Sequence, residues 1–227
     1  MRNLLFIVAA GMLFLTACQE DDNPTVNAKN YYQAYELEYN SLEGETIARA
    51  FFKEKDATGQ FLPLDDGAEV RVNGEKLEQE SDLDATYKTT FPGQVDTARY
   101  EYADKDGNVY TNEFYMDDVA PIDFSPNTGP FNMFSSYDIT WDGAPVQENE
   151  KVVFQLGRTN GGMINVIVDE VGANSFVLED RDLMEVGKGQ AKMALYRVEQ
   201  SPLDDTNEAG GRMQLIHATG LVSVTIE

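Results

Sequence analysis

The sequence predicts an all-β fold of two tandem antiparallel β-sandwiches. Polar and apolar residues alternate with a period of two through many short runs rich in valine, isoleucine, tyrosine and phenylalanine. Glycine, asparagine and aspartate bound these runs, and such residues favour tight turns. Only residues 178–186 have the pattern of a short helical turn. Many short strands with regular turn signals are typical of sandwiches.

The first sandwich is expected over residues 31–120. Two pairs of strand-like runs in it are separated by Asn73-Gly74 and by the turn at residues 104–107, and Asn-Gly between alternating runs strongly indicates a hairpin. The alternation places Tyr35 and Tyr39 on a core face. The expected strands lie near residues 35–39, 47–52, 70–72, 76–77, 87–91, 100–102 and 109–115.

The second sandwich is expected over residues 121–227, after a linker at 117–121. Trp141 lies in an alternating run and is expected in the core of this sandwich. A single larger, broken sandwich is the alternative to two domains. The expected strands lie near residues 137–141, 152–156, 164–168, 176–178, 193–198, 213–215 and 222–226.

The amino-terminal residues have the layout of a secretory signal peptide, which we assign to residues 1–17. One basic residue precedes an apolar run over residues 4–15, which is too short to span a membrane. The run ends at Leu15-Thr16-Ala17-Cys18, which resembles the lipobox of bacterial lipoproteins. The resemblance implies cleavage before Cys18, the only cysteine, and attachment of diacylglycerol and an acyl chain, typically palmitate, at that residue. The alternative is an ordinary secreted protein that is cut near Ala17.

The residues after the cysteine predict where the protein is localised. Gln19, Glu20, Asp21 and Asp22 resemble the export signal that sends Bacteroidota lipoproteins to the outer face of the outer membrane. A lipidated acidic tether is expected over residues 18–30, and the alternative to the export signal is that this cluster is only the solvated start of the tether. The whole chain resembles small Bacteroidota lipoproteins with two immunoglobulin-like β-sandwiches, chiefly over residues 46–116, and this resemblance implies a fold and an address but no catalytic residues.

The composition restricts the classes of partner. The chain carries 40 acidic and 17 basic residues, for a net charge of −23. Such a charge argues against nucleic acid, which requires a basic patch, and suits a soluble, exposed protein. No cysteine follows Cys18, so the folded region can hold neither a disulfide nor a thiolate metal site. We expect no cofactor.

No catalytic or metal site is predicted. His217 is the only histidine, and we expect it on a strand, facing solvent or a sheet edge. The segment 104–108 has aspartates and a glycine, but their spacing fails the EF-hand pattern, so turn chemistry is the better interpretation. A looser calcium site at one end of a sandwich is the alternative. The acidic pairs 65–66 and 204–205 are interpreted in the same way. Pairs of carboxylates suited to a glycosidase would arise by chance among so many acids.

The function expected from the sequence is non-catalytic binding or adhesion at the outer envelope, through a lipid anchor in the membrane. Exposed aromatic side chains would then contact a glycan or a protein partner. The candidates are two clusters, Tyr31, Tyr32, Tyr35 and Tyr39, and Phe131, Phe134 and Tyr137, whose alternative role is to pack the cores. A structural or accessory subunit of an envelope complex is the alternative function, and a surface glycan hydrolase is a remote one.

Overall fold

The computed structural model describes residues 31–81, 85–126 and 128–227. It confirms the all-β sandwich fold, and its central feature is one nine-stranded sheet. In spatial order this sheet consists of β12 (Met163–Val168), β11 (Glu150–Gly157), β14 (Gly189–Pro202), β15 (Gly211–Ala218), β1 (Tyr31–Asn40), β2 (Glu45–Glu54), β6 (Thr86–Pro92) and β5 (Glu78–Ser81), with β16 (Val222–Ile226) paired to β14.

Two smaller sheets cover the two ends of the large one. The first sheet consists of β4 (Glu75–Lys76), β3 (Glu69–Val72), β7 (Thr97–Ala103) and β8 (Val109–Tyr115). The second consists of β13 (Ser175–Leu178), β10 (Tyr137–Gly143) and β9 (Ile122–Phe124). A 3-10 turn, η2 (Met116–Asp118), follows β8. The helix α1 (Asp180–Val186) forms within the segment that the sequence predicts as a helical turn.

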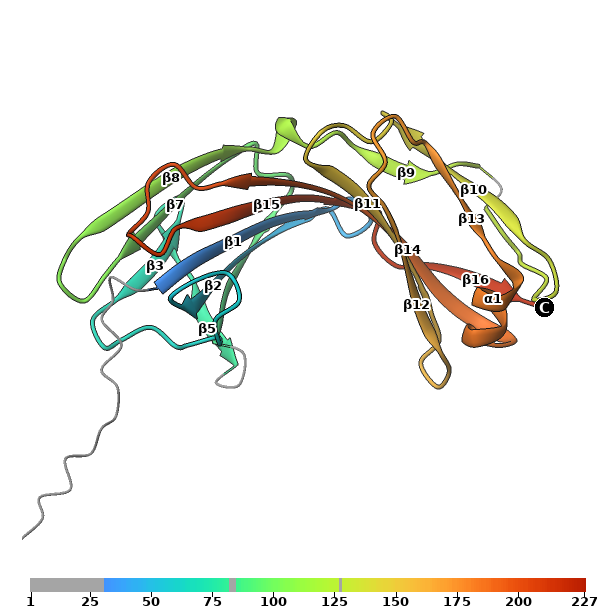
Figure 1. Ribbon diagram of the computed structural model, residues 1–227, viewed down its shortest axis with the longest axis horizontal. Coiled ribbons are helices and arrows are strands. Elements are labelled where there is room, and N and C mark those ends of the chain that lie inside the picture. Colours follow the sequence, from blue (N-terminus) through green and yellow to red (C-terminus); the bar gives the residue numbers. More distant parts are fainter. Residues whose placement is uncertain (1–30, 82–84, 127) are drawn as a thin grey trace, which may run out of the picture.

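The molecule has the outline of an arch in Figure 1. We call its two halves the first arm, with β7 and β8 along its outer side, and the second arm, with β10 and β13 along its outer side. The large sheet lies on the inner side of both arms (Figure 1). One face of that sheet therefore packs against the smaller sheets, and its other face is turned toward the inside of the arch.

Each arm has its own hydrophobic core, built by the predicted alternation. In β2 the burial alternates residue by residue, so that Ala48, Ala50 and Phe52 are fully buried. In the first core Tyr35 stacks on Tyr100 with ring centroids 4.6 Å apart. The second core holds Trp141, as the sequence predicts. Such burial of apolar side chains is the main source of stability in a fold of this kind.

The chain crosses between the cores more than once. Val119 belongs to the first core and Ile122 to the second, so the segment predicted as a linker connects them. However, the later residues Leu203, Met213 and Leu215 return to the first core. Residues 121–227 therefore supply strands to both arms, and β15 completes the first sandwich.

Strand β14 physically joins the arms. Its residues 192–199 pair with β11, and its residues 196–202 pair with β15. Strand β15 then pairs in parallel with β1, over residues 33–40 of β1, while every other ladder between named strands is antiparallel. The two sandwiches are consequently not separate domains joined only by a flexible linker, because a hydrogen-bonded sheet continues from one to the other.

Candidate binding surface

The face of the large sheet that is turned away from both cores is the candidate functional surface, and we call it the inner face. Successive side chains of a strand point to opposite faces of the sheet, so the residues that alternate with the core residues lie on the inner face. It carries Ala34, Glu36 and Glu38 of β1, Arg49, Phe51 and Lys53 of β2, Arg212, Gln214 and Ile216 of β15, Tyr196 and Val198 of β14, Val153 and Gln155 of β11, and Met163, Asn165 and Ile167 of β12.

A charged cluster occupies the part of the inner face over β1 and β2. The Arg49 guanidinium donates to Glu38 Oε2 at 2.7 Å and also to Glu36. Burial raises the pKa of the Glu36 carboxyl above its usual value, although Arg49 opposes this shift. Both contacts are made by Arg49 Nη1, so two carboxylates hold this side chain in place.

A pocket of about 170 Å³ lies beside this cluster, with both apolar and cationic walls. Phe51 and Phe61 form its aromatic wall, with ring centroids 6.0 Å apart, and Phe61 is 48% exposed. The Lys53 ammonium lies 4.8 Å from the centre of the Phe61 ring. Arg212 on β15, which pairs with Ala34 of β1, also lines the pocket.

Lys53 and Arg212 are the two cations that line this pocket, and the Glu36 carboxylate lines it as well. Lys53 Nζ donates to the carbonyl oxygen of Ala57 at 2.7 Å. The Nε atom of Arg212 is buried and has no hydrogen-bond acceptor among the residues that the structure describes. Within the same residues, neither side chain lies within 4.0 Å of a carboxylate. In a chain of net charge −23, the pocket therefore presents two positive groups beside an aromatic wall. One of them, Arg212, attracts the Glu36 carboxylate and so opposes the rise in the pKa of Glu36 that burial causes.

An apolar strip continues the inner face toward the second arm. Val198, Ile216 and Ala218 form a small buried cluster there, with Tyr196 packed against it. Beyond it, Ile167 on β12 is 60% exposed. The inner face is therefore charged and aromatic on one arm, with side chains of both signs, and aliphatic on the other.

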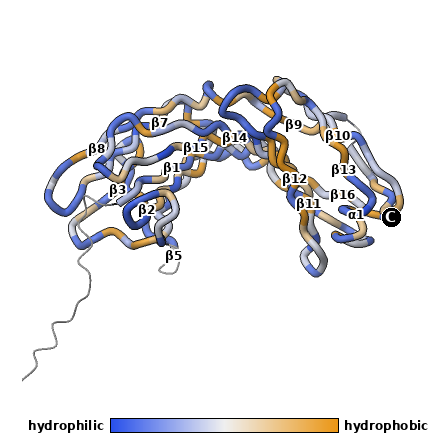
Figure 2. Tube along the Cα trace, in the orientation of Figure 1, coloured by the Kyte–Doolittle hydropathy of each residue, from blue (hydrophilic) through white to orange (hydrophobic). Residues whose placement is uncertain are grey.

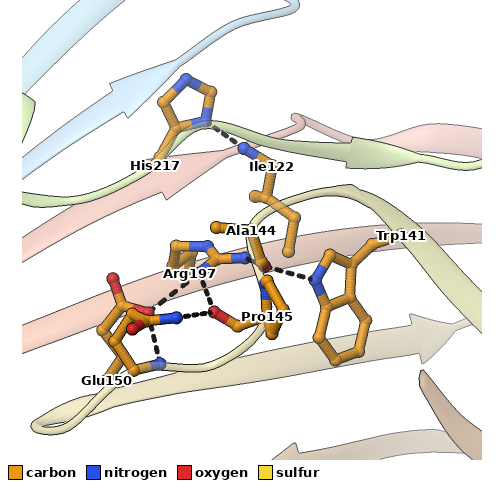
Figure 3. A network of polar contacts seen from close by, with 8 residues as sticks. Ile122, Trp141, Ala144, Pro145, Glu150, Arg197 and His217 are labelled. Atoms are coloured by element: carbon orange, nitrogen blue, oxygen red, sulfur yellow. Dashed lines mark hydrogen bonds and ion pairs between the residues drawn. The ribbon is translucent and has the colours of Figure 1, made fainter. Parts of the chain in front are cut away.

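A polar network lies behind the sheet where the arms meet (Figure 3). Arg197 is fully buried, and its Nη1 lies 2.9 Å from Glu150 Oε2. The same guanidinium donates to the carbonyl oxygens of Pro145 and Ala144, and the Trp141 indole N–H donates to Ala144 at 3.2 Å. A buried charge is tolerated only when it is paired in this way, so the network fixes the junction.

The prediction that His217 faces solvent or a sheet edge is wrong. Its side chain is only 7% exposed and lies at the junction of the arms, where the backbone N–H of Ile122 donates to Nδ1 at a long 3.5 Å (Figure 3). The Tyr39 ring packs edge-on against it at 5.4 Å. Burial lowers the pKa of His217, and the nearby Arg197 lowers it further. The alternation placed His217 on a strand but could not show that β9 would cover it.

The acidic turn at residues 104–108 has the hydrogen bonds of a turn. Asp104 Oδ1 accepts the backbone N–H groups of Asp106 and Asn108, each at 2.9 Å, and Gly107 has a φ of +85°. Burial opposes ionisation, but these bonds and that of the Asn108 side chain lower the pKa of Asp104. Across residues 31–81, 85–126 and 128–227 no cluster of three or more His, Cys, Asp or Glu side chains could hold a metal ion.

The predicted aromatic clusters divide between core and surface. Tyr31 and Tyr35 are buried in the first core, and Tyr39 packs against it. Phe131 is buried in the second core, whereas Phe134 is 71% exposed. The exposed aromatic wall of the pocket, Phe61, lies in neither cluster. A sequence signal for it was the pair of apolar residues at positions 61–62, isolated between turn residues.

The predicted lipidation and sorting residues, Cys18 with Gln19, Glu20, Asp21 and Asp22, lie outside the described residues. Among the residues that are described, no helix has the length and apolar character needed to cross a membrane.

Comparisons with known proteins give weak structural similarities. No protein-family model matches the sequence, and no curated protein matches it. Among solved structures, the chain is similar to the Yersinia pseudotuberculosis adhesin InvE, with 14% identity over 88% of this chain and 60% of that one, at a TM-score of 0.26. It is also similar to E. coli alpha-2-macroglobulin, with 11% identity over 87% of this chain and 14% of that one, at a TM-score of 0.27.

A third similarity is to a tetra-tandem repeat in the extending region of a large adhesion protein, with 11% identity over 86% of this chain and 49% of that one, at a TM-score of 0.25. In each case the chain spans less than two thirds of the other protein. Similarities of this strength support no inference about function.

Proposed function

We propose that this protein is a lipid-anchored lipoprotein of the outer envelope, with a non-catalytic binding role that its inner face performs. The observation that carries the binding role is the pocket of Lys53, Arg212 and Phe61. Exposed aromatic rings stack on sugar rings, and guanidinium groups bind carboxylates with directional, charge-assisted hydrogen bonds. A glycan that carries carboxylate groups matches both features.

The charge of the pocket supports this choice of ligand. The rest of the chain is strongly acidic, so a negatively charged glycan would be repelled from most of the surface. At the pocket, two cations lie beside an aromatic ring, and among the described residues neither has a carboxylate within 4.0 Å, although Arg212 attracts the more distant Glu36. Binding of a neutral sugar would leave both cations unused, whereas a uronic acid would engage them through its carboxylate.

The proposed anchor rests on the sequence alone. The apolar run, the lipobox-like Leu15 to Cys18 and the acidic residues that follow together support a diacylated cysteine and export to the cell surface. One acyl chain anchors a protein only weakly, whereas two or more hold it stably, because each buried CH₂ contributes about 0.8 kcal/mol. The arch would then be held at the membrane through the amino-terminal side of β1.

The anchor and the address are tested together in intact cells. Metabolic labelling with palmitate should mark the wild type but not Cys18→Ser. External protease should cut the wild type on intact cells and spare a variant in which Glu20, Asp21 and Asp22 are changed to alanine, while lysed cells show that both can be cut. Absence of label would refute the lipid anchor, and protection of the wild type would refute surface display.

The binding role is tested separately with purified protein on a panel of acidic and neutral glycans. We expect binding to carboxylated glycans and loss of that binding in Arg212→Gln. Equal binding to neutral glycans, or no binding to any acidic glycan, would refute the proposed ligand class.

The structural role in an envelope complex remains the second candidate, because the aliphatic part of the inner face favours a protein contact. Ile167 and Met163 are both more than half exposed on β12. Co-purification of another membrane protein with the wild type, and its loss in Ile167→Lys, would favour that role over glycan binding.

A further inference from the structure

Strand β12 is an unprotected edge of the large sheet. Its six residues read Met-Ile-Asn-Val-Ile-Val, without a charge, a proline or a bulge. Figure 2 colours much of the β11–β12 hairpin as hydrophobic. An exposed edge strand offers unpaired N–H and C=O groups to another strand, and proteins that avoid such pairing usually block the edge.

Three other edges, at β5, β8 and β16, are blocked. Strand β5, at the opposite end of the sheet, carries Glu78 and Glu80 and has an irregular register. On β8 the outward N–H of Thr111 donates to Asp205 at 2.8 Å. The free side of β16 is occupied by the segment around Phe131, whose N–H donates to the carbonyl of Thr225 at 3.0 Å. The edge at β12 is therefore open where the edges at β5, β8 and β16 are not.

The backbone groups that β12 leaves free can be identified from its register with β11. Arg158 N–H donates to Gly162 at 3.1 Å, so in the alternating antiparallel ladder the even-numbered residues of β12 face β11. The backbone groups of Met163, Asn165 and Ile167 consequently point away from the sheet. Outside the β11 ladder they have no backbone hydrogen bond with any described residue.

We propose that β12 pairs with β12 of a second copy of this chain, antiparallel and about a two-fold axis at Asn165. In this register Asn165 lies opposite Asn165 of the second copy, and Met163 lies opposite Ile167 of the second copy. These are the residues with free backbone groups, so each free N–H meets a free carbonyl. The two large sheets become one continuous sheet, which is the self-complementary contact expected of a two-fold dimer.

Charge complementarity favours a second copy as the occupant of this edge. The end of β12 near Met163 is basic, because Arg158 and Lys192 line a hollow of about 200 Å³ with it. The other end continues into Asp169 and Glu170, both exposed. Antiparallel pairing sets the acidic end of one copy against the basic end of the other, and the uncharged strand itself adds no repulsion between two acidic chains.

The side chains of this edge also match under the two-fold axis. Met163 and Ile167 are 59% and 60% exposed and lie on the same face of β12, two residues on either side of the axis. In the proposed register each would cover the other across the new strand pair, which removes apolar surface from water. The pairing does not depend on the glycan pocket, which lies on the other arm.

A single introduced cysteine tests the register directly. Residues directly opposite in a hydrogen-bonded antiparallel pair have Cα atoms about 5.5 Å apart, within the range of a disulfide. The full-length Asn165→Cys protein should therefore form a reducible dimer on mild oxidation, with the wild type giving the baseline from Cys18. Val177→Cys, on the exposed edge strand β13, is the matched control and should stay at that baseline. No dimer above baseline for Asn165→Cys would overturn the register.

The association itself is tested by the mass of the full-length protein in solution, measured by light scattering across a concentration series. We expect the wild type to approach twice the monomer mass and Ile167→Lys to remain monomeric. Val177→Lys places the same charge on another exposed strand, so it should behave as the wild type. A monomeric wild type at every concentration, or a dimer that persists in Ile167→Lys, would overturn the proposal.

Discussion

The shared sheet predicts that damage to one core destabilises the other. Leu37 is fully buried in the first core, on β1, between Ala48 of β2 and Leu215 of β15. Truncation of a buried leucine to alanine costs about 2–5 kcal/mol, because it removes apolar contact and leaves a cavity. For a protein of this size each kcal/mol lowers the melting temperature by roughly 2–4 °C, so Leu37→Ala should melt about 4–20 °C lower.

The effect of this truncation is measured in the second core. Trp141 is the only tryptophan and lies 5% exposed in the second core, so its fluorescence reports that core alone. Because β14 pairs with strands of both arms, loss of the first core removes β15 from β14 and exposes the junction. For Leu37→Ala, we expect the melting temperatures followed by Trp141 fluorescence and by tyrosine circular dichroism to fall together, in one transition.

The matched control places the same truncation in the second core. Leu156 on β11 is equally buried, and Leu156→Ala should lower the melting temperature by a similar amount whether fluorescence or circular dichroism is followed. The reasoning is refuted if Leu37→Ala leaves the Trp141 transition of the wild type unchanged while circular dichroism shows a separate, earlier one. The two arms would then be independent domains.

Three further perturbations test the junction and the sheet. Glu150→Ala leaves the buried Arg197 unpaired and should cost about 3–5 kcal/mol in urea unfolding; a loss below about 1 kcal/mol would contradict the role of the pair. Burial lowers the pKa of His217, so its neutral form stabilises the fold above the unfolded pKa of about 6.5, and this stability is lost as pH falls below that value. His217→Gln should flatten that part of a melting-temperature profile against pH, and an unchanged slope would exclude His217 as its origin. Gly211→Ala would place a Cβ 2.6 Å from the carbonyl oxygen of Gln33 and should cost about 1–3 kcal/mol in thermal melts by forcing β15 from β1, whereas a neutral effect would contradict the close packing.

Local features of the fold could be predicted from the sequence because they depend on neighbouring residues. The alternation in β2 is reproduced as alternate burial, and the Asn73-Gly74 signal corresponds to a turn in which both residues have positive φ. The aspartates at 104–106 form the hydrogen bonds expected of a turn. Each of these features follows from side-chain period or backbone preference within a few residues.

Non-local features could not be predicted in the same way. The parallel pairing of β1 with β15 joins Gln33 to Gly211, and no local pattern encodes which distant strands meet. The burial of His217 depends on β9 from the second half of the molecule. The pocket likewise requires Lys53 and Arg212 from strands far apart in the sequence. Composition showed only that the chain is acidic, and it could not show where on the surface the basic side chains gather.

The central claim is that the inner-face pocket binds carboxylated glycans, and the most direct measurement is the affinity of the purified protein for immobilised polygalacturonate. A hydrogen bond to a charged group contributes about 1.5–3 kcal/mol, so Arg212→Gln should weaken binding by roughly tenfold to a hundredfold. Arg99→Gln, on β7 at the outer side of the same arm, removes the same charge and should bind as the wild type. Equal loss in both variants, or no binding by the wild type, would contradict the account.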